Sequence, residues 1–338
     1  MSNKKPRLST PALIPHPNPP TLVHGQYTRE QLRSTVAEKE FCIITNVLSD
    51  SVVTSTCNGL KKAYESIFNG ETNESMGFSL DDVATLVNTP PYKGNGIVAA
   101  KATAGLVDLV ALKLNADVSQ VYESYYGCTA EQLATSNDRF GVMLPSNEKS
   151  GLAPHIDANP CKESMVLNED MLQGFVVLQD SVDESQGFVI YPGHARNPGK
   201  WAKSSTSCKG DFYLLDDDQK ERIGRGYVIA PPAGSMVVWL SSAVHANSNG
   251  KGKKQSVGRI VAYIAKYPWS LISDEAARAL EIAIVQRTTL GHNTKRPSPQ
   301  QTSGFRFAPQ IDWQFKPEFL SHYGSVDDIP RLLKKVKD

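Results

Sequence analysis

The stretch Ala-Gly-Ser-Met-Val-Val-Trp-Leu-Ser-Ser-Ala-Val-His, residues 233–245, decides the fold class of this chain. Its centre is an apolar run from Met236 to Leu240, with Gly234 before it and two serines after it. Short apolar runs that are rich in β-branched and aromatic residues and bounded by turn residues are typical of buried strands. We therefore predict a strand here, with His245 just past its end.

Runs of the same kind recur between about residues 139 and 268, and turn residues such as Gly193, Gly210 and Gly234 separate them. The candidate strands are 139–144, 172–179, 187–191, 211–215, 226–230, 235–241 and 258–267. Many short strands in close succession are typical of a double-sheet barrel of the jelly-roll or cupin type. The predicted fold class is therefore α+β, mainly β, with a double-stranded β-helix as its core.

Helical patterns flank this core on both sides. Segment 49–135 is mainly helical because apolar residues recur in it at helical spacing, and a further helix is predicted over 273–286. Thr28 begins a capping-box pattern, Thr-Arg-Glu-Gln, that predicts a short helix. Residues 1–27 contain six prolines and should form an extended tail. We therefore expect a single domain over 28–338 behind a proline-rich tail.

Composition and charge are those of an ordinary globular protein. Hydrophobic residues make up 40% of the chain, charged residues 21%, and the net charge is +1. This balance shows no electrostatic footprint for nucleic acid or an anionic membrane. The five cysteines form no C-x-x-C motif, which favours a reducing compartment, and no apolar run reaches transmembrane length. We expect an intracellular, cytoplasmic protein, while Lys4, Lys5 and Arg7 leave a nuclear address open.

Four polar residues near the predicted strands form the candidate site. His155 and Asp157 make an H-x-D pair, His245 follows 90 residues after His155, and Arg259 lies 14 residues beyond His245. Two histidines and one carboxylate form the facial triad that holds non-haem Fe(II) and leaves coordination positions open for reactants. An arginine nearby can bind a carboxylate co-substrate through two parallel hydrogen bonds. The sequence thus predicts an oxygen-activating metal centre.

The placement of these residues supports the metal site more than the H-x-D spacing does. A predicted strand, 139–144, and a loop, 145–154, lead to His155, while Arg259 opens another predicted strand. Neighbouring strands of one small barrel would bring the ligands together. Three unrelated polar residues at loop edges remain an alternative. Catalytic zinc accepts the same donors, although the sequence has no H-E-x-x-H motif that would supply a general base.

The chain resembles the phytanoyl-CoA dioxygenase-like family of Fe(II)/2-oxoglutarate-dependent oxygenases. The resemblance lies in EFCIITNVLS (40–49), PHID (154–157), LQGFVVLQD (172–180) with QGFVIYPGH (186–194), and AGSMVVWLSSAVH (233–245) with Arg259 beyond it. The order and spacing of these segments carry it over about 38–268. The family usually has a small residue and then histidine after Pro-Gly, whereas here His194 follows Gly193 directly. We therefore interpret His194 as a turn residue rather than a ligand.

The resemblance implies a cofactor and two co-substrates. Fe(II) would be held by the two histidines and the aspartate of the triad. 2-Oxoglutarate would bind the metal and place its far carboxylate on Arg259, and O2 would complete the reactants, with succinate and CO2 as products. Gln173 is a further candidate for the co-substrate site, unless it only faces the opposite sheet, and Asn247 is another. Because halogenating relatives replace the carboxylate ligand by a small residue, Asp157 implies hydroxylation or a related oxidation.

The sequence leaves the main substrate and the oligomeric state open. We expect a small-molecule substrate because the family accepts many kinds of small molecule. The same chemistry on a protein side chain or a nucleobase is one alternative. A non-catalytic jelly-roll binding module is another, and loss of any member of the triad or of Arg259 would have favoured it.

Overall fold

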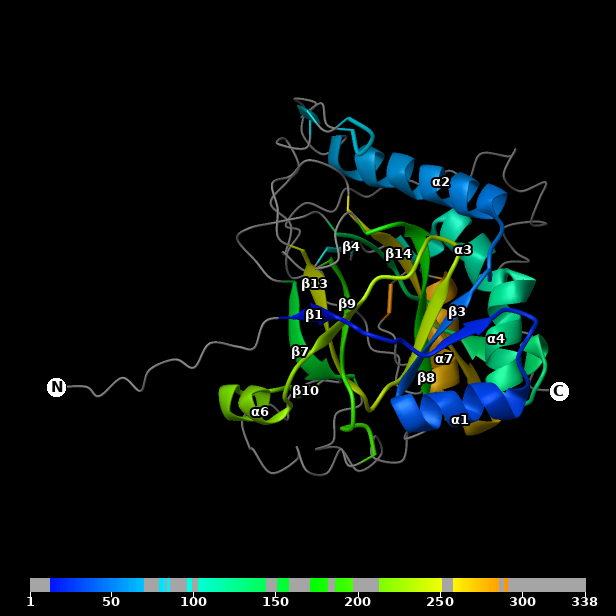
Figure 1. The fold of residues 1–338 in the computed structure, drawn as a ribbon. Helices are drawn as coiled ribbons and strands as arrows, with labels where there is room; N and C mark the ends of the chain where they lie inside the picture. Colours follow the sequence, from blue (N-terminus) through cyan, green and yellow to red (C-terminus); the bar gives the residue numbers. More distant parts are fainter. Residues whose placement is uncertain are drawn as a thin grey trace.

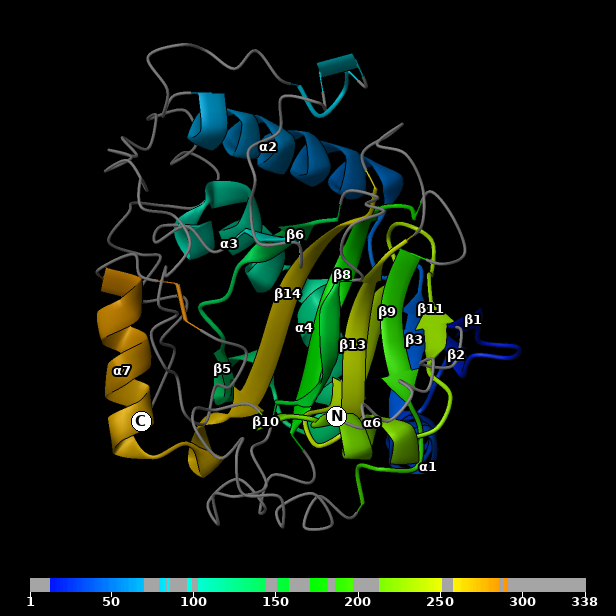
Figure 2. The same ribbon diagram turned by 90° about the vertical axis from the view of Figure 1, so that its left-hand side faces the viewer.

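The computed structural model describes residues 13–69, 79–82, 84–85, 96–98, 103–143, 151–157, 171–181, 186–196, 213–250, 258–285 and 289–290. These residues form two mixed β-sheets with helices around them (Figures 1 and 2). Two sheets with flanking helices agree with the predicted class. Within the described part of the chain, the sheets stay open and do not close into a barrel.

The first sheet has six strands and carries most of the candidate site. Its order is β1 (Ile14–Pro15), β11 (Tyr227–Ile229), β9 (Gln186–Tyr191), β13 (Val244–Asn249), β7 (Leu152–Ile156) and β10 (Tyr213–Leu214). The pair β1–β11 is parallel and the other pairs are antiparallel. Strand β13 is therefore central, with β9 on one side and β7 on the other.

The second sheet has eight strands. Its path is β2 (Thr21–Val23), β3 (Phe41–Thr45), β12 (Met236–Leu240), β8 (Leu172–Gln179), β14 (Ile260–Pro268), β6 (Phe140–Val142) and β4 (Ile97–Val98), and β5 (Leu133–Thr135) pairs with β14. From β6 to β14 the chain crosses between the two sheets at each step, apart from β9, β10 and β11, which share the first sheet. Strands far apart in the sequence thereby become neighbours.

The helices lie mainly against the second sheet. They are α1 (Arg29–Lys39), α2 (Asp50–Asn69), α3 (Val107–Leu114), α4 (Ala116–Tyr126), α6 (Asp217–Arg222) and α7 (Asp274–Val285), with short 3-10 turns at Thr103–Gly105, Ala130–Gln132 and Trp269–Leu271. The predicted capping box of the first helix is confirmed, since Thr28 and Gln31 exchange side-chain and backbone hydrogen bonds. No helix among the described residues is long and apolar enough to cross a bilayer.

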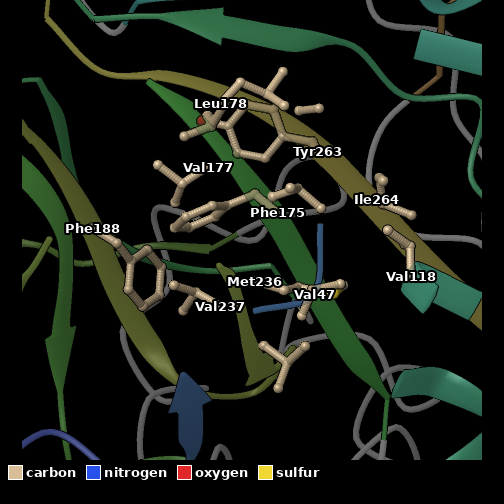
Figure 3. Packing of buried hydrophobic residues seen from close by; sticks show 14 of the residues in the cluster. Val47, Val118, Phe175, Val177, Leu178, Phe188, Met236, Val237, Tyr263 and Ile264 are labelled. Atoms are coloured by element: carbon tan, nitrogen blue, oxygen red, sulfur yellow. The ribbon is translucent and has the colours of Figure 1, made fainter. Parts of the chain in front are cut away.

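The space between the sheets is filled by aromatic side chains. Phe175 of β8 and Phe188 of β9 meet with ring centroids 5.7 Å apart, and Phe188 lies 4.9 Å from Trp239 of β12. Figure 3 shows Phe175 and Phe188 approaching each other from their two strands, while Val118 and Ile264 lie on the other side of the second sheet. Because side chains alternate along a strand, residues two positions from these rings share the inner faces.

Two strands of the first sheet differ from the sequence prediction. Residues 145–154 were expected to form a loop, yet His155 lies within β7, and the segment before residue 151 lies outside the described residues. His245 was expected just past a strand, yet it lies within β13. The sequence of β13, VHANSN, is polar, and pairing with strands on both sides stabilises it instead of apolar character.

Candidate metal centre

Strands β7 and β13 bring His155 and His245 together. The two residues are direct partners in the antiparallel ladder, so their side chains share one face of the sheet. Asp157 lies just beyond the end of β7 and turns its carboxylate toward both rings. The histidines are 4% and 3% exposed, which places the group inside the protein.

The donor atoms of these side chains converge. His155 Nε2 lies 3.4 Å from Asp157 Oδ1, and His245 Nε2 lies 3.3 Å from Asp157 Oδ2. The two imidazole ring centroids are 4.2 Å apart, and the three ligand atoms lie within 4.8 Å of one another. The structure thus brings the three predicted ligands into one cluster.

The other ring nitrogens fix the tautomer of each histidine. Nδ1 of His155 lies 2.8 Å from the carbonyl oxygen of Ala153, and Nδ1 of His245 lies 3.0 Å from that of Ala243. A carbonyl oxygen only accepts hydrogen bonds, so each Nδ1 must carry the proton and donate it. In the neutral rings both Nε2 lone pairs then point toward Asp157, which is also an acceptor. Three electron-rich atoms therefore face one another.

Charges within the cluster shift its pKa values. Burial raises the pKa of Asp157, but the two histidines outweigh it and hold that pKa well below its usual range. Burial lowers the pKa of His155, yet the hydrogen bond and charge of Asp157 raise it overall. For His245, burial and the neighbouring His155 lower the pKa. The carboxylate is therefore ionised, and a positive charge between the three groups is favourable.

A single divalent metal ion fits this donor set. First-row metals bind imidazole nitrogen and carboxylate oxygen at about 2.0–2.2 Å, so neighbouring ligands around one ion lie roughly 3 Å apart. The observed separations of 3.3 and 3.4 Å are close to this, and they are longer than charge-assisted hydrogen bonds of about 2.8 Å. Fixing each Nδ1–H on a carbonyl is the usual second contact of a metal-bound histidine.

Arg259 lies in the same inner region, and no carboxylate among the described residues pairs with it. It is fully buried, its Nη2 donates to Oδ1 of Asn247 at 3.1 Å, and its guanidinium lies 5.0 Å from the ring centroid of Phe175. Its Nε and Nη1 have no hydrogen-bond partner among the described residues, and burial lowers its pKa to about 10. Asn247 is two residues beyond His245, about 7 Å along β13. The structure therefore places an uncompensated cation near the cluster.

Gln173 faces the inner space from the second sheet. It lies two residues before Phe175 on β8, so the two side chains point to the same face of the sheet. Its direct partner on β12 is Trp239, whose ring centroid lies 5.4 Å from that of His245. Gln173 is 1% exposed, and neither of its amide atoms has a hydrogen-bond partner among the described residues. Such buried, unsatisfied amides are rare and costly. A polar ligand between the sheets would satisfy this one.

His194 lies apart from the cluster. Its Nε2 contacts the carbonyl oxygen of Ile223 at 3.1 Å, and it follows Gly193, whose φ of 92° marks a tight turn. The metal-binding group found among the described residues does not contain it, in agreement with its interpretation as a turn residue. Arg139 and Trp239 also face the inner space but were not singled out from the sequence. For Arg139, the signal in the sequence was its place at the start of an apolar run, where a charged residue is unusual.

Comparisons with known proteins find solved structures of similar fold. No family model matches, and no curated protein matches. The hypothetical protein JW0805 from Escherichia coli is 12% identical, with 80% of this chain and 77% of that chain covered and a TM-score of 0.56. GlcNAc Inducible Gene 2, GIG2 (DUF1479), from Candida albicans is also 12% identical, with 95% and 80% covered and a TM-score of 0.55. Identities this low establish similarity of fold and no more.

A further match is the epimerase SnoN, whose structure is in complex with Fe3+, alpha ketoglutarate and nogalamycin RO. It is 15% identical, the alignment covers 71% of this chain and 83% of that chain, and the TM-score is 0.47. This match is weaker in shape and supports no conclusion about this chain by itself. The resemblance to the phytanoyl-CoA dioxygenase-like family thus depends on the sequence motifs alone.

Proposed function

We propose that this protein is an Fe(II)- and 2-oxoglutarate-dependent dioxygenase that hydroxylates a small molecule. The observation that carries the proposal is the convergence of His155, Asp157 and His245, with the buried Arg259 near them, whose Nε and Nη1 have no hydrogen-bond partner among the described residues. We assign residues 28–338 to one oxygenase domain of the phytanoyl-CoA dioxygenase-like family and residues 1–27 to an N-terminal segment whose strands β1 and β2 join the two sheets of that domain. The alternation of strands between two sheets supports a double-stranded β-helix as the core.

The two histidines and the aspartate would hold the metal. The chemistry that a metal site of this kind would supply, with 2-oxoglutarate and O2 bound, is the oxidation of a substrate C–H bond, with release of succinate and CO2. The carbonyl oxygens of Ala153 and Ala243 keep each Nδ1 protonated and so keep each Nε2 available as a ligand. Asp157 offsets part of the metal charge, and its presence as a carboxylate ligand favours hydroxylation over halogenation.

Arg259 would bind the far carboxylate of 2-oxoglutarate. Its free Nε and Nη1 groups can donate to that anion while Nη2 stays on Asn247, which holds the guanidinium in place. Gln173 supplies an amide donor and acceptor on the opposite sheet, for the co-substrate or for groups at the metal. The rings of Phe175, Phe188 and Trp239 exclude water from this space and strengthen each of these contacts.

Anaerobic spectroscopy tests the proposal directly. Addition of Fe(II) and 2-oxoglutarate to the protein should produce a weak visible charge-transfer band. The band should disappear in His155→Ala, which removes a ligand. His194→Ala is the matched control, since His194 is a half-buried histidine outside the cluster, and it should keep the band.

Two outcomes would contradict the proposal. The absence of a band in the wild-type protein together with tight zinc binding would favour a zinc hydrolase with the same ligands. Bands of equal intensity in wild type and His155→Ala would show that the triad does not hold the metal. Succinate release without added substrate, measured on the same samples, separates an enzyme from a non-catalytic binding module.

A further inference from the structure

Arg139 is a second buried arginine of the inner region, and none of the roles above uses it. It lies directly before β6, is 7% exposed, and its Nε and Nη1 atoms have no hydrogen-bond partner among the described residues. Its Nε lies 3.8 Å from Oδ1 of Asp138, which is beyond hydrogen-bond distance. That oxygen instead accepts from the backbone N–H of Arg139 at 2.8 Å. The guanidinium is therefore ion-paired with a buried carboxylate, but two of its hydrogen-bond donors are unused among the described residues.

The register of β6 points Arg139 into the space between the sheets. Tyr263 N donates to the carbonyl oxygen of Arg139 at 3.1 Å, and the pair Phe140–Ala262 is next in the ladder, so Arg139 and Tyr263 are opposite each other. Opposite residues of an antiparallel pair share a face. Tyr263 faces the inner ring of Phe175, with ring centroids 6.2 Å apart. A Cβ on Gly141, two residues after Arg139, would lie 3.4 Å from the Tyr263 ring, which confirms the shared face.

The order of the strands places Arg139 on the side of the metal cluster. In the second sheet β6 follows β14, and in the first sheet β7, which carries His155, follows β13. Arg259 at the start of β14 bonds to Asn247 of β13, so these two strands face each other across the sandwich. Their outer neighbours β6 and β7 then lie on the same side. Arg139 and the triad therefore border the same part of the inner space.

Arg139 and Arg259 enter the inner space from different strands. The backbone of Tyr263, the partner of Arg139, lies four residues along β14 from that of Arg259, or about 13 Å at the usual rise, and the charges of both guanidinium groups act on the Tyr263 hydroxyl. The co-substrate has two carboxylates, and the proposed function assigns one to the metal and the other to Arg259. Buried hydrogen-bond donors without an acceptor are costly, and guanidinium groups match carboxylates in shape. Resting on the proposed function, we propose that Arg139 binds a carboxylate of the main substrate, which is therefore a carboxylate-bearing small molecule.

A matched pair of small probes tests this inference. Benzoate and benzamide are titrated calorimetrically into the protein with Mn(II) and 2-oxoglutarate present, because they differ in charge but hardly in shape. Wild type should bind benzoate about tenfold or more tightly than benzamide, as a charge-assisted pair predicts. Arg139→Met should reduce this ratio to about one, and Arg139→Lys should keep part of it. The exposed Arg225 provides the control Arg225→Met, which should leave the ratio unchanged.

The outcomes separate this inference from the proposed function. The Fe(II)–2-oxoglutarate charge-transfer band, measured on the same variants, should be unchanged in Arg139→Met. An intact band with no benzoate preference in wild type, or with a preference that survives in Arg139→Met, would overturn the inference alone. A 2-oxoglutarate affinity that falls in Arg139→Met as much as benzoate affinity would also overturn it, because Arg139 would then hold the co-substrate. A missing band in wild type would overturn the proposed function, while the benzoate ratio would still decide whether Arg139 binds an anion.

Discussion

Replacement of Arg259 by methionine should separate binding of the co-substrate from stability of the fold. Each pKa unit corresponds to about 1.4 kcal/mol, so a guanidinium whose pKa is about 10 rather than above 12 carries an electrostatic cost on the order of 3 kcal/mol. A carboxylate beside it would relieve this cost. Arg259→Met should therefore raise the Kd for 2-oxoglutarate on the order of a hundredfold.

The stability of the ligand-free protein should respond differently. The substitution removes the electrostatic cost, but it also removes the hydrogen bond to Asn247 and the contact with Phe175, which together contribute about 3 kcal/mol. These contributions nearly cancel, so the free energy of unfolding should change by less than about 1 kcal/mol. If Arg259 had only a structural role, Arg259→Met would instead lower the free energy of unfolding.

The assay combines two measurements. Anaerobic titration of the Fe(II) protein with 2-oxoglutarate, followed by the charge-transfer band, gives the Kd, and urea unfolding gives the stability. Arg225→Met, a substitution of an exposed arginine, controls for a general loss of positive charge. If Arg259→Met binds 2-oxoglutarate within about threefold of wild type, or if its unfolding free energy falls by several kcal/mol, the assignment of Arg259 to the co-substrate is wrong.

Two further predictions concern buried polar groups. Burial lowers the pKa of Lys113 to about 7 and that of Lys266 to about 8, so between pH 7 and pH 9 the unfolded chain binds more protons than the folded chain, and the free energy of unfolding should rise with pH. Urea melts across this range should show a shallower rise in Lys113→Met, and equal slopes would contradict the lowered pKa of Lys113. Gln173→Met should stabilise the ligand-free protein by about 1 kcal/mol, because it removes two unsatisfied amide atoms, and should weaken binding of 2-oxoglutarate or slow turnover. A destabilised Gln173→Met with unchanged kinetics would show that the amide has a structural partner instead.

Sequence patterns predicted the apolar strands well because those strands are buried on both faces. β8 and β12 appear as continuous apolar runs, and their observed bounds lie within a residue of the predicted ones. β14 is similar, although it begins at Ile260, so Arg259 precedes the strand. The helices and the first N-cap also followed from local spacing and capping chemistry. These elements depend on burial and local hydrogen bonds, which the sequence expresses directly.

The two strands that hold the triad were not predicted, and the reason is physical. β13 reads VHANSN because its inward positions carry His245 and Asn247 rather than apolar residues. β7 contains Pro154, which lacks a backbone donor, and the ladder between β7 and β13 shifts register between His245 and Asn247. Polar site residues thus replace the apolar residues that usually mark a buried strand, so the strand pattern is not visible in the sequence. The strand beside Arg139 was predicted, but the burial of its side chain depends on the opposite sheet and could not be predicted from the local sequence.

The first strands of the chain pair with its late parts, and this constrains the order of folding. Ile14 in β1 pairs with Tyr227 in β11, a separation of 213 residues (227 − 14), and β2 pairs with β3 in the other sheet. During synthesis, residue 14 leaves the ribosome long before its partner exists. Closing so long a loop is entropically slow, so the β1 segment should dock late, after both sheets have formed. Until then the edge of β11 stays open, and nascent chains at high concentration should be most prone to associate there.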